Sequence, residues 1–209
     1  MKTYLSAATL IVIYIFVFLA INTIHFLYFP VRVVLYDTLL DIVIALLPFA
    51  VIYVLVLRKR LALSRPELVL SLLVGLLIAV NYAISIPTVI DRSLSAYILE
   101  KLAQRGGAIQ FSAFPRIFAD EYMKEHRLVD IRLTEQLESG TIVIQNGCVR
   151  LTDRGRLVAT ITRFYRTHFL PKEREIMGSY TDALTDPFRN STPENYACSA
   201  PAAAGGNTK

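Results

Sequence analysis

The first ninety residues consist of three long apolar runs separated by short polar breaks. The runs cover residues 4–29, 38–57 and 68–90, and Asp41 is the only formally charged residue inside them. About 20 apolar residues in a helix are enough to cross the hydrocarbon core of a membrane. Each run therefore predicts a transmembrane helix. The first run exceeds the apolar stretch of a cleavable signal peptide, so we expect it to be retained as an anchor.

The positive charges beside the runs predict an orientation. Residues 58–65 hold four Lys or Arg and, with three spans, share one side of the membrane with the N-terminus. The other side has Arg32 and Arg92 close to the membrane. Short loops rich in Lys and Arg stay in the cytoplasm. We therefore expect a multi-pass protein of a bacterial inner membrane, with a cytoplasmic N-terminus and a periplasmic C-terminal part.

Polar residues in and beside the runs form a candidate intramembrane cluster. With alternating helix directions they all fall toward the side of the C-terminal part: His25, Asp37, Asp41, Asn81 and Arg92. A charge inside a membrane is costly and tends to face protein or water. We expect Asp41 to pair with His25, Asn81 or a partner subunit. Contact between helices is the favoured role; a pocket for a lipid headgroup or sugar and a proton path are the alternatives.

Residues 91–176 show shorter periodic segments that predict a small domain. Their order is helix, strand, helix, helix, strand, strand, helix, at 94–105, 108–111, 112–125, 129–139, 141–145, 148–151 and 153–169. Asn146-Gly147 lies between the last two strands and is a strong hairpin signal, because a type I′ turn needs positive φ at both positions. We divide the chain into a three-span region (1–90), this domain (91–176) and an extended or disordered tail (177–209).

This order, together with the motif Leu151-Thr152-x-x-Gly155, resembles the MarR-like winged helix-turn-helix family over about 80 residues. The predicted fold class is therefore three transmembrane helices followed by a small α+β winged-helix-like domain. The resemblance implies DNA binding, with the helix at 129–139 in the major groove.

The charges on that helix argue against DNA. It carries Arg132 against three acidic residues, whereas binding to phosphates needs Lys and Arg. Possible DNA contacts are limited to Arg132, Gln136 and, on the hairpin, Arg150. We therefore favour a domain that contacts other proteins through the hairpin, the acidic helix and the basic helix after it.

The helix at 153–169 is basic and amphipathic. Its candidate interaction surface consists of Arg154, Arg156, Arg163 and Arg166, which could meet an acidic partner or anionic lipid headgroups. Its apolar positions are expected to pack inward: Leu157, Val158, Ile161, Tyr165 and Phe169.

Composition adds little chemistry to this picture. The 209 residues are 54% hydrophobic with a net charge of +5, which fits a membrane protein and does not require nucleic acid. The two cysteines, Cys148 and Cys198, could form a disulfide if the C-terminal part lies outside the cytoplasm, but free thiols are the favoured expectation because Cys198 lies in the tail. No nucleophile, phosphate-binding or metal-ligand motif is found in the sequence, so we expect no cofactor and no metal.

These observations favour a non-enzymatic accessory subunit of a larger membrane assembly, either a homo-oligomer or a complex with another membrane protein. The stretch 91–99, DRSLSAYIL, is similar to uncharacterised three-span bacterial inner-membrane proteins, which implies a role in envelope glycan or lipid-linked sugar synthesis. The alternatives are a membrane-bound transcription regulator and an enzyme that uses Asp37, Asp41 and His25 at the membrane face.

Overall fold

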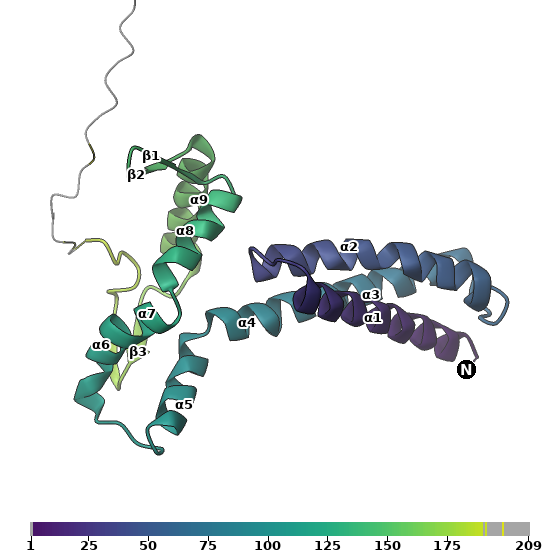
Figure 1. Cartoon of the computed structure of the whole chain (residues 1–209), viewed down its shortest axis with the longest axis horizontal. Helices are drawn as coiled ribbons and strands as arrows, with labels where there is room; N and C mark the ends of the chain where they lie inside the picture. Colours follow the sequence, from purple (N-terminus) through teal and green to yellow (C-terminus); the bar gives the residue numbers. More distant parts are fainter. Residues whose placement is uncertain (1, 190, 192–197, 199–209) are drawn as a thin grey trace, which may run out of the picture. The chain divides into compact units, whose positions relative to one another are not determined.

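The computed structural model describes residues 2–189, 191 and 198 and divides the chain into two compact units, Met1–Glu135 and Gln136–Lys209 (Figure 1). The first unit holds three helices long and apolar enough to cross a membrane, at Lys2–Tyr28, Val34–Leu57 and Arg65–Arg92. The three predicted spans are thus confirmed as helices, and their length and composition suit a multi-pass membrane protein.

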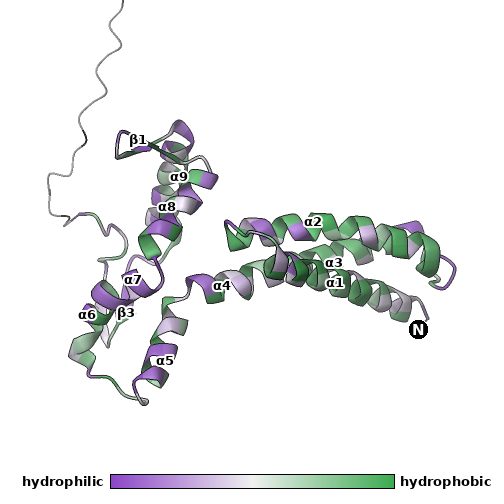
Figure 2. Cartoon of the chain, viewed as in Figure 1, coloured by the Kyte–Doolittle hydropathy of each residue, from purple (hydrophilic) through white to green (hydrophobic). Residues whose placement is uncertain are grey.

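The spans are built from five helical segments. They are α1 (Lys2–Tyr28), α2 (Val34–Ile52), a π-helical turn (Tyr53–Leu57), α3 (Arg65–Ser85) and α4 (Pro87–Arg92). The helices α1, α2 and α3 lie side by side (Figure 1) and are hydrophobic along most of their length (Figure 2). The start of α3 is set by a capping box, in which Glu67 accepts hydrogen bonds from the backbone and the hydroxyl of Ser64 at 2.7 and 2.8 Å.

A stripe of small residues on α3 packs against α1. The buried residues of α3 are Ser71, Gly75, Ala79 and Ala83, one per turn. A Cβ at Gly75 would lie 2.9 Å from Cδ1 of Tyr14, so the glycine lets the tyrosine ring approach the α3 backbone. The Tyr14 hydroxyl in turn donates to the carbonyl of Ile42 at 3.0 Å. One aromatic side chain of α1 therefore contacts both other spans.

The remainder of the first unit is helical. It comprises α5 (Leu94–Gln104), a helical run over 111–125 that includes α6 (Phe114–Arg116), a π-helical segment (Ile117–Tyr122) and α7 (Met123–Glu125), and then α8 (Leu128–Glu138). The predicted strand at 108–111 is wrong: residues 108–110 have no regular structure and a 3₁₀ turn begins at Phe111. Gly106 and Gly107, at φ 81° and 95°, turn the chain there without opening a strand.

The second unit begins with the predicted hairpin. Strands β1 (Ile142–Gln145) and β2 (Cys148–Leu151) pair antiparallel, with Gln145 opposite Cys148. Asn146 and Gly147 both have positive φ, 52° and 74°, as a type I′ turn requires. The prediction of this hairpin is confirmed.

Helix α9 (Asp153–Phe169) is anchored to the hairpin at its first turn. Thr152 caps it by accepting from the backbone N–H of Gly155 at 3.0 Å. A Cβ at Gly155 would lie 2.1 Å from the carbonyl oxygen of Thr141, so no larger residue fits without moving backbone. The expectation that the apolar residues of α9 pack inward is wrong: Gly155 is the one buried residue of this helix, and Leu157, Val158, Ile161, Tyr165 and Phe169 are exposed.

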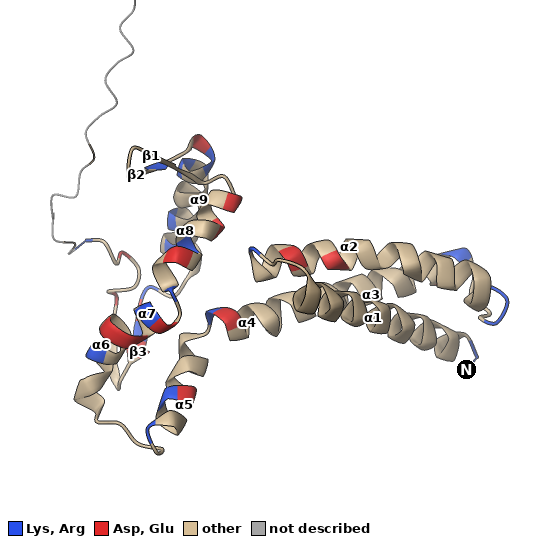
Figure 3. Cartoon of the chain, viewed as in Figure 1, with Lys and Arg blue, Asp and Glu red and all other residues tan. Residues whose placement is uncertain are grey.

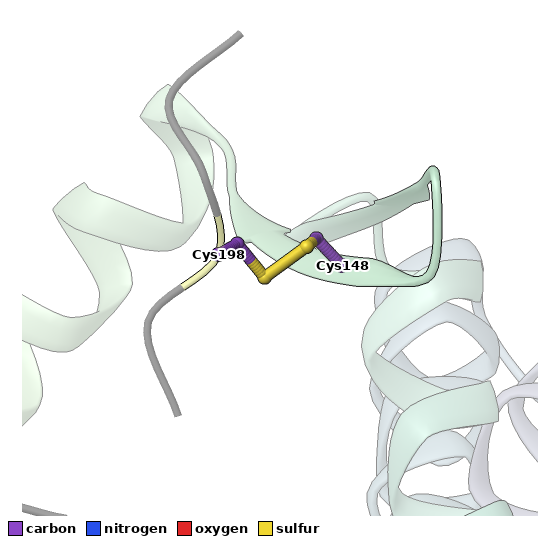
Figure 4. The surroundings of a disulfide bond; sticks show 2 residues. All are labelled: Cys148 and Cys198. Carbon is purple, nitrogen blue, oxygen red and sulfur yellow. A yellow bond between two sulfur atoms is a disulfide. The ribbon is translucent and has the colours of Figure 1, made fainter. Parts of the chain in front are cut away.

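Two features of the C-terminal segment were not predicted. Strands β3 (Arg174–Ile176) and β4 (Ser179–Thr181) form a second hairpin. Cys148 and Cys198 form a disulfide with their Cα atoms 6.0 Å apart, which links β2 to the tail (Figure 4), so the expectation of free thiols is wrong. The other residues beyond Arg189, apart from Ser191, lie outside the described part of the chain, and the prediction of an extended or disordered tail is not tested there.

Candidate functional site

The carboxylate of Asp41 is the centre of a polar cluster inside the membrane bundle. Asp41 lies on α2 and is 1% exposed. Its Oδ2 accepts from Nδ2 of Asn22 at 2.8 Å, and its Oδ1 lies 2.7 Å from Nδ1 of His25. Both partners come from α1, three residues apart and therefore on one face of that helix. The cluster thus joins the first two spans through both oxygens of one carboxylate.

The protonation of the histidine ring follows from this pairing. An ionised carboxylate only accepts hydrogen bonds, so Nδ1 of His25 must carry the proton that faces Asp41. The arrangement is that of a carboxylate that orients a histidine ring.

A cavity of about 370 Å³ adjoins the pair. Apart from His25 and Asp41 its lining is apolar: Ile21, Ile24, Phe29, Leu40 and Ile44. A sugar would need several hydrogen-bonding groups, which these side chains do not offer, whereas an acyl chain needs none. The chemistry of the lining therefore suits a lipid tail better than a sugar.

The other predicted members of the cluster lie elsewhere. Asp37 accepts from the backbone N–H groups of Arg32 and Val33 at 2.8 and 3.3 Å, so it caps the turn between the first two spans. Asn81 lies on the exposed face of α3. Arg92 forms an ion pair with Glu135 at 2.7 Å. The structure therefore unites His25 and Asp41 with Asn22, another polar residue near the same end of the first span, and separates Asp37, Asn81 and Arg92 from them.

The candidate DNA contacts are engaged within the chain. Arg132 donates to Glu135 at 2.8 Å, on the carboxylate that also binds Arg92. Oε1 of Gln136 accepts from the hydroxyl of Thr141 at 2.5 Å. Arg150 lies on β2 and also takes part in an interaction. Arg132 and Gln136 would each have to give up a hydrogen bond to meet a base.

A second ionic cluster was missed by the sequence analysis. Lys101 on α5 is 4% exposed and lies 2.6 Å from Glu121 and 2.7 Å from Glu125, and Tyr97 donates to Glu125 at 2.8 Å. These hydrogen bonds raise the pKa of Lys101 and lower the pKa of both glutamates, while burial raises the pKa of Tyr97. No signal in the sequence distinguished this lysine from a solvated one.

Basic residues are spread along α9 (Figure 3), and their contacts differ. Arg156 pairs with Asp153 within one turn, and the guanidinium of Arg166 lies 5.6 Å from the ring centre of Phe188. Arg154 and Arg163 are exposed. The four arginines therefore line one helix, and two of them already have partners inside the second unit.

No protein family, curated protein or solved structure matches the chain. Within the described residues no group of three or more His, Cys, Asp or Glu side chains is placed to hold a metal ion. The chemical assignment of each site therefore rests on its geometry.

The Asp41 cluster gives a prediction about the stability of the bundle. Replacing Asp41 with Leu leaves Asn22 and His25 without their acceptor, and we expect a loss of about 1–3 kcal/mol in the free energy of unfolding. Replacing Asn22, His25 and Asp41 together with Leu should recover at least half of that loss, because no orphaned polar group remains. Titration with a denaturing detergent measures both.

Leu47→Ala on the exposed side of α2 serves as the control and should change stability by no more than about 0.5 kcal/mol. A triple variant as unstable as the single one would contradict the structural role of the cluster.

The Lys101 cluster predicts a pH dependence. Because the pKa values of Glu121 and Glu125 are lowered on folding, their contribution is complete above the ordinary value of 4.5 and is lost as pH falls through the lowered values. Because the pKa of Lys101 is raised, its contribution is complete below 10.5 and is lost only at higher pH. Protection against hydrogen exchange over residues 94–125, measured relative to the intrinsic exchange rate at each pH, should therefore fall below about pH 4.5.

The matched variant is Lys101→Met, which should exchange faster at neutral pH and show a weaker acid dependence. An unchanged acid dependence in this variant would assign the transition to other groups.

Proposed function

We propose that this protein is a non-enzymatic subunit of a larger membrane assembly, in which α3 packs against a transmembrane helix of a partner. The observation that carries the proposal is the position of Asn81, a polar side chain within a span that faces outward. Its neighbours one turn away, Leu77 and Ile84, are also exposed. The small-residue stripe of α3 is already used inside the chain, so this outward face is the one left for a partner.

The energy of an exposed amide in lipid supports a partner there. A side-chain amide without a hydrogen bond in an apolar environment costs at least about 1–3 kcal/mol. Polar side chains in membrane spans commonly bond to neighbouring helices, and such bonds contribute about 1–2 kcal/mol in model peptides. A second copy of this chain or another membrane protein would supply that bond.

The part of the chain that follows the third span, called the soluble part below, offers a further surface for protein contact. On the first hairpin, Ile144 and Val149 are 46% and 48% exposed. The acidic side chains of α8 are less available than expected, since Asp130 pairs with Arg127 and Glu135 with two arginines. The hairpin is therefore the better candidate than the acidic helix.

We also propose that the soluble part lies outside the cytoplasm and that its helices and first hairpin form a winged-helix-like domain. The disulfide supports the location, because disulfides persist in oxidising compartments. The excess of Lys and Arg at 58–65 supports it independently. The order helix, helix, helix, hairpin, helix is compatible with a winged helix that lacks its first strand. DNA binding is not favoured, because Arg132 and Gln136 are engaged.

The partner proposal predicts that Asn81→Leu weakens the assembly. Losing one interhelical hydrogen bond of about 1.4 kcal/mol would weaken association about tenfold. Native mass spectrometry of protein extracted in a mild detergent measures the fraction in the larger species. Asn81→Gln keeps the amide, so most of the protein should remain in the larger species. Equal assembly of the Leu variant and the native protein would contradict the role of Asn81.

The location predicts the behaviour of fusions after Arg189. Alkaline phosphatase, which is active only outside the cytoplasm, should be active at this position. A fluorescent protein that matures only in the cytoplasm should remain dark. The reverse pair of results would place the soluble part inside, and the transcription regulator would then become the better proposal.

A further inference from the structure

Helix α9 is amphipathic, and its apolar face is uncovered. Six large apolar side chains, each between 46% and 65% exposed, fall on one side at helical spacing: Leu157, Val158, Ile161, Phe164, Tyr165 and Phe169. Nearly all of these positions recur at intervals of three or four residues, so they form one continuous stripe along the helix. The stripe begins two residues after Gly155, the contact with the first hairpin.

The second unit covers a different side of this helix. Gly155 meets the carbonyl of Thr141, and Arg166 lies over the ring of Phe188. Ala159 and Arg163 line a cavity of about 350 Å³ together with Asp186, Phe188 and Arg189. The tail thus lies against the side that bears Arg163 and Arg166, and within the second unit the apolar stripe stays open.

A stripe of this size is unusual in contact with water. Contiguous exposed apolar patches generally mark a binding surface for protein or membrane. This chain is held in a bilayer by three spans, so a membrane surface is always within reach of the soluble part.

The charge of α9 indicates which kind of surface, protein or membrane, covers the apolar stripe. Four arginines against one aspartate give the helix a net charge of +3. A basic polar face opposite a face rich in Phe and Leu is typical of helices that lie in the plane of a membrane interface. Arg156, Arg163 and Arg166 lie on the side opposite the stripe, and Arg154 lies at the start of the stripe, one turn before Leu157 and Val158.

We infer that α9 lies on the membrane surface with Phe164 and its apolar neighbours among the acyl chains, and with Arg154, at the start of the stripe, at anionic lipid headgroups. This contact needs neither the partner at Asn81 nor a particular side of the membrane. The tyrosine and phenylalanine rings would sit at the boundary between headgroups and chains, where aromatic side chains are favoured.

The sequence offers a clean test because it contains no tryptophan. The full-length protein is prepared with a single tryptophan, either Phe164→Trp on the apolar stripe or Ala159→Trp on the side that faces the tail. Each variant is reconstituted alone into vesicles of phosphatidylcholine, or of phosphatidylcholine with phosphatidylglycerol, in which part of the phosphatidylcholine carries bromine on its acyl chains. Brominated chains quench tryptophan on contact.

In anionic vesicles we expect the tryptophan at position 164 to lose about half of its fluorescence, and the one at position 159 to lose much less. Quenching at position 164 should decrease in vesicles without phosphatidylglycerol and in the additional variant Arg154→Gln.

Three results would overturn the inference. Equal quenching at both positions would show that no particular face of α9 contacts the acyl chains. Equal quenching with and without phosphatidylglycerol would deny the role of charge. A tryptophan at position 164 that escapes quenching would deny insertion, and blue-shifted emission in that case would show that protein, from this chain or a second copy, covers the stripe. The experiment contains no partner protein, so failure of the partner proposal would not affect it.

Discussion

The buried carboxylate of Asp41 sets the architecture of the membrane bundle. A charge at that depth is tolerated only if its hydrogen bonds are made by protein, and both oxygens of Asp41 find donors on α1, in Asn22 and His25. This requirement fixes the register of α1 against α2, because a shift of one residue would turn Asn22 and His25 away from the carboxylate. Tyr14 then lies where it can donate to Ile42 and press against Gly75, so the position of α3 follows from the same constraint.

The same reasoning separates polar residues that hold the chain together from those that are left for other molecules. Asp37 caps the turn between the first two spans, and Arg92 and Arg132 share Glu135. Asn81 differs, since it faces outward from a span whose inner face is filled by small residues. A polar group satisfied within the chain stabilises the fold, whereas one that faces lipid without a hydrogen-bond partner among the described residues indicates an interface. This difference favours a subunit of an assembly over an isolated enzyme.

The sequence predicted the features that depend on local chemistry. The apolar runs, the Asn146-Gly147 turn and the full extent of α9 follow from periodicity and turn residues, and they match the structure. The direction of successive spans placed His25, Asn81 or a partner subunit within reach of Asp41, and the structure selects His25. The failures concern contacts between distant residues. The strand at 108–111 had no partner to pair with, Cys198 is 50 residues from Cys148, and Lys101 became buried only because Glu121 and Glu125 lie beside it. Amphipathicity gave the apolar face of α9 correctly, but it cannot distinguish a face that packs on protein from one that meets lipid.

The second unit shows why an external surface matters for stability. Its buried residues among those described are Thr141, Ile142 and Gly155, which is far too small a core for a unit of this length. The disulfide closes a loop of 50 residues and would contribute about 4 kcal/mol in the chain-entropy description, so it substitutes for part of the missing core. The rest must come from what the unit touches. A helix whose apolar stripe is open and whose other side is held by the tail gains that stabilisation when the stripe leaves water. Folding of the second unit and its binding to the membrane surface are therefore coupled. The burial of the apolar stripe stabilises α9 and also holds it at the membrane.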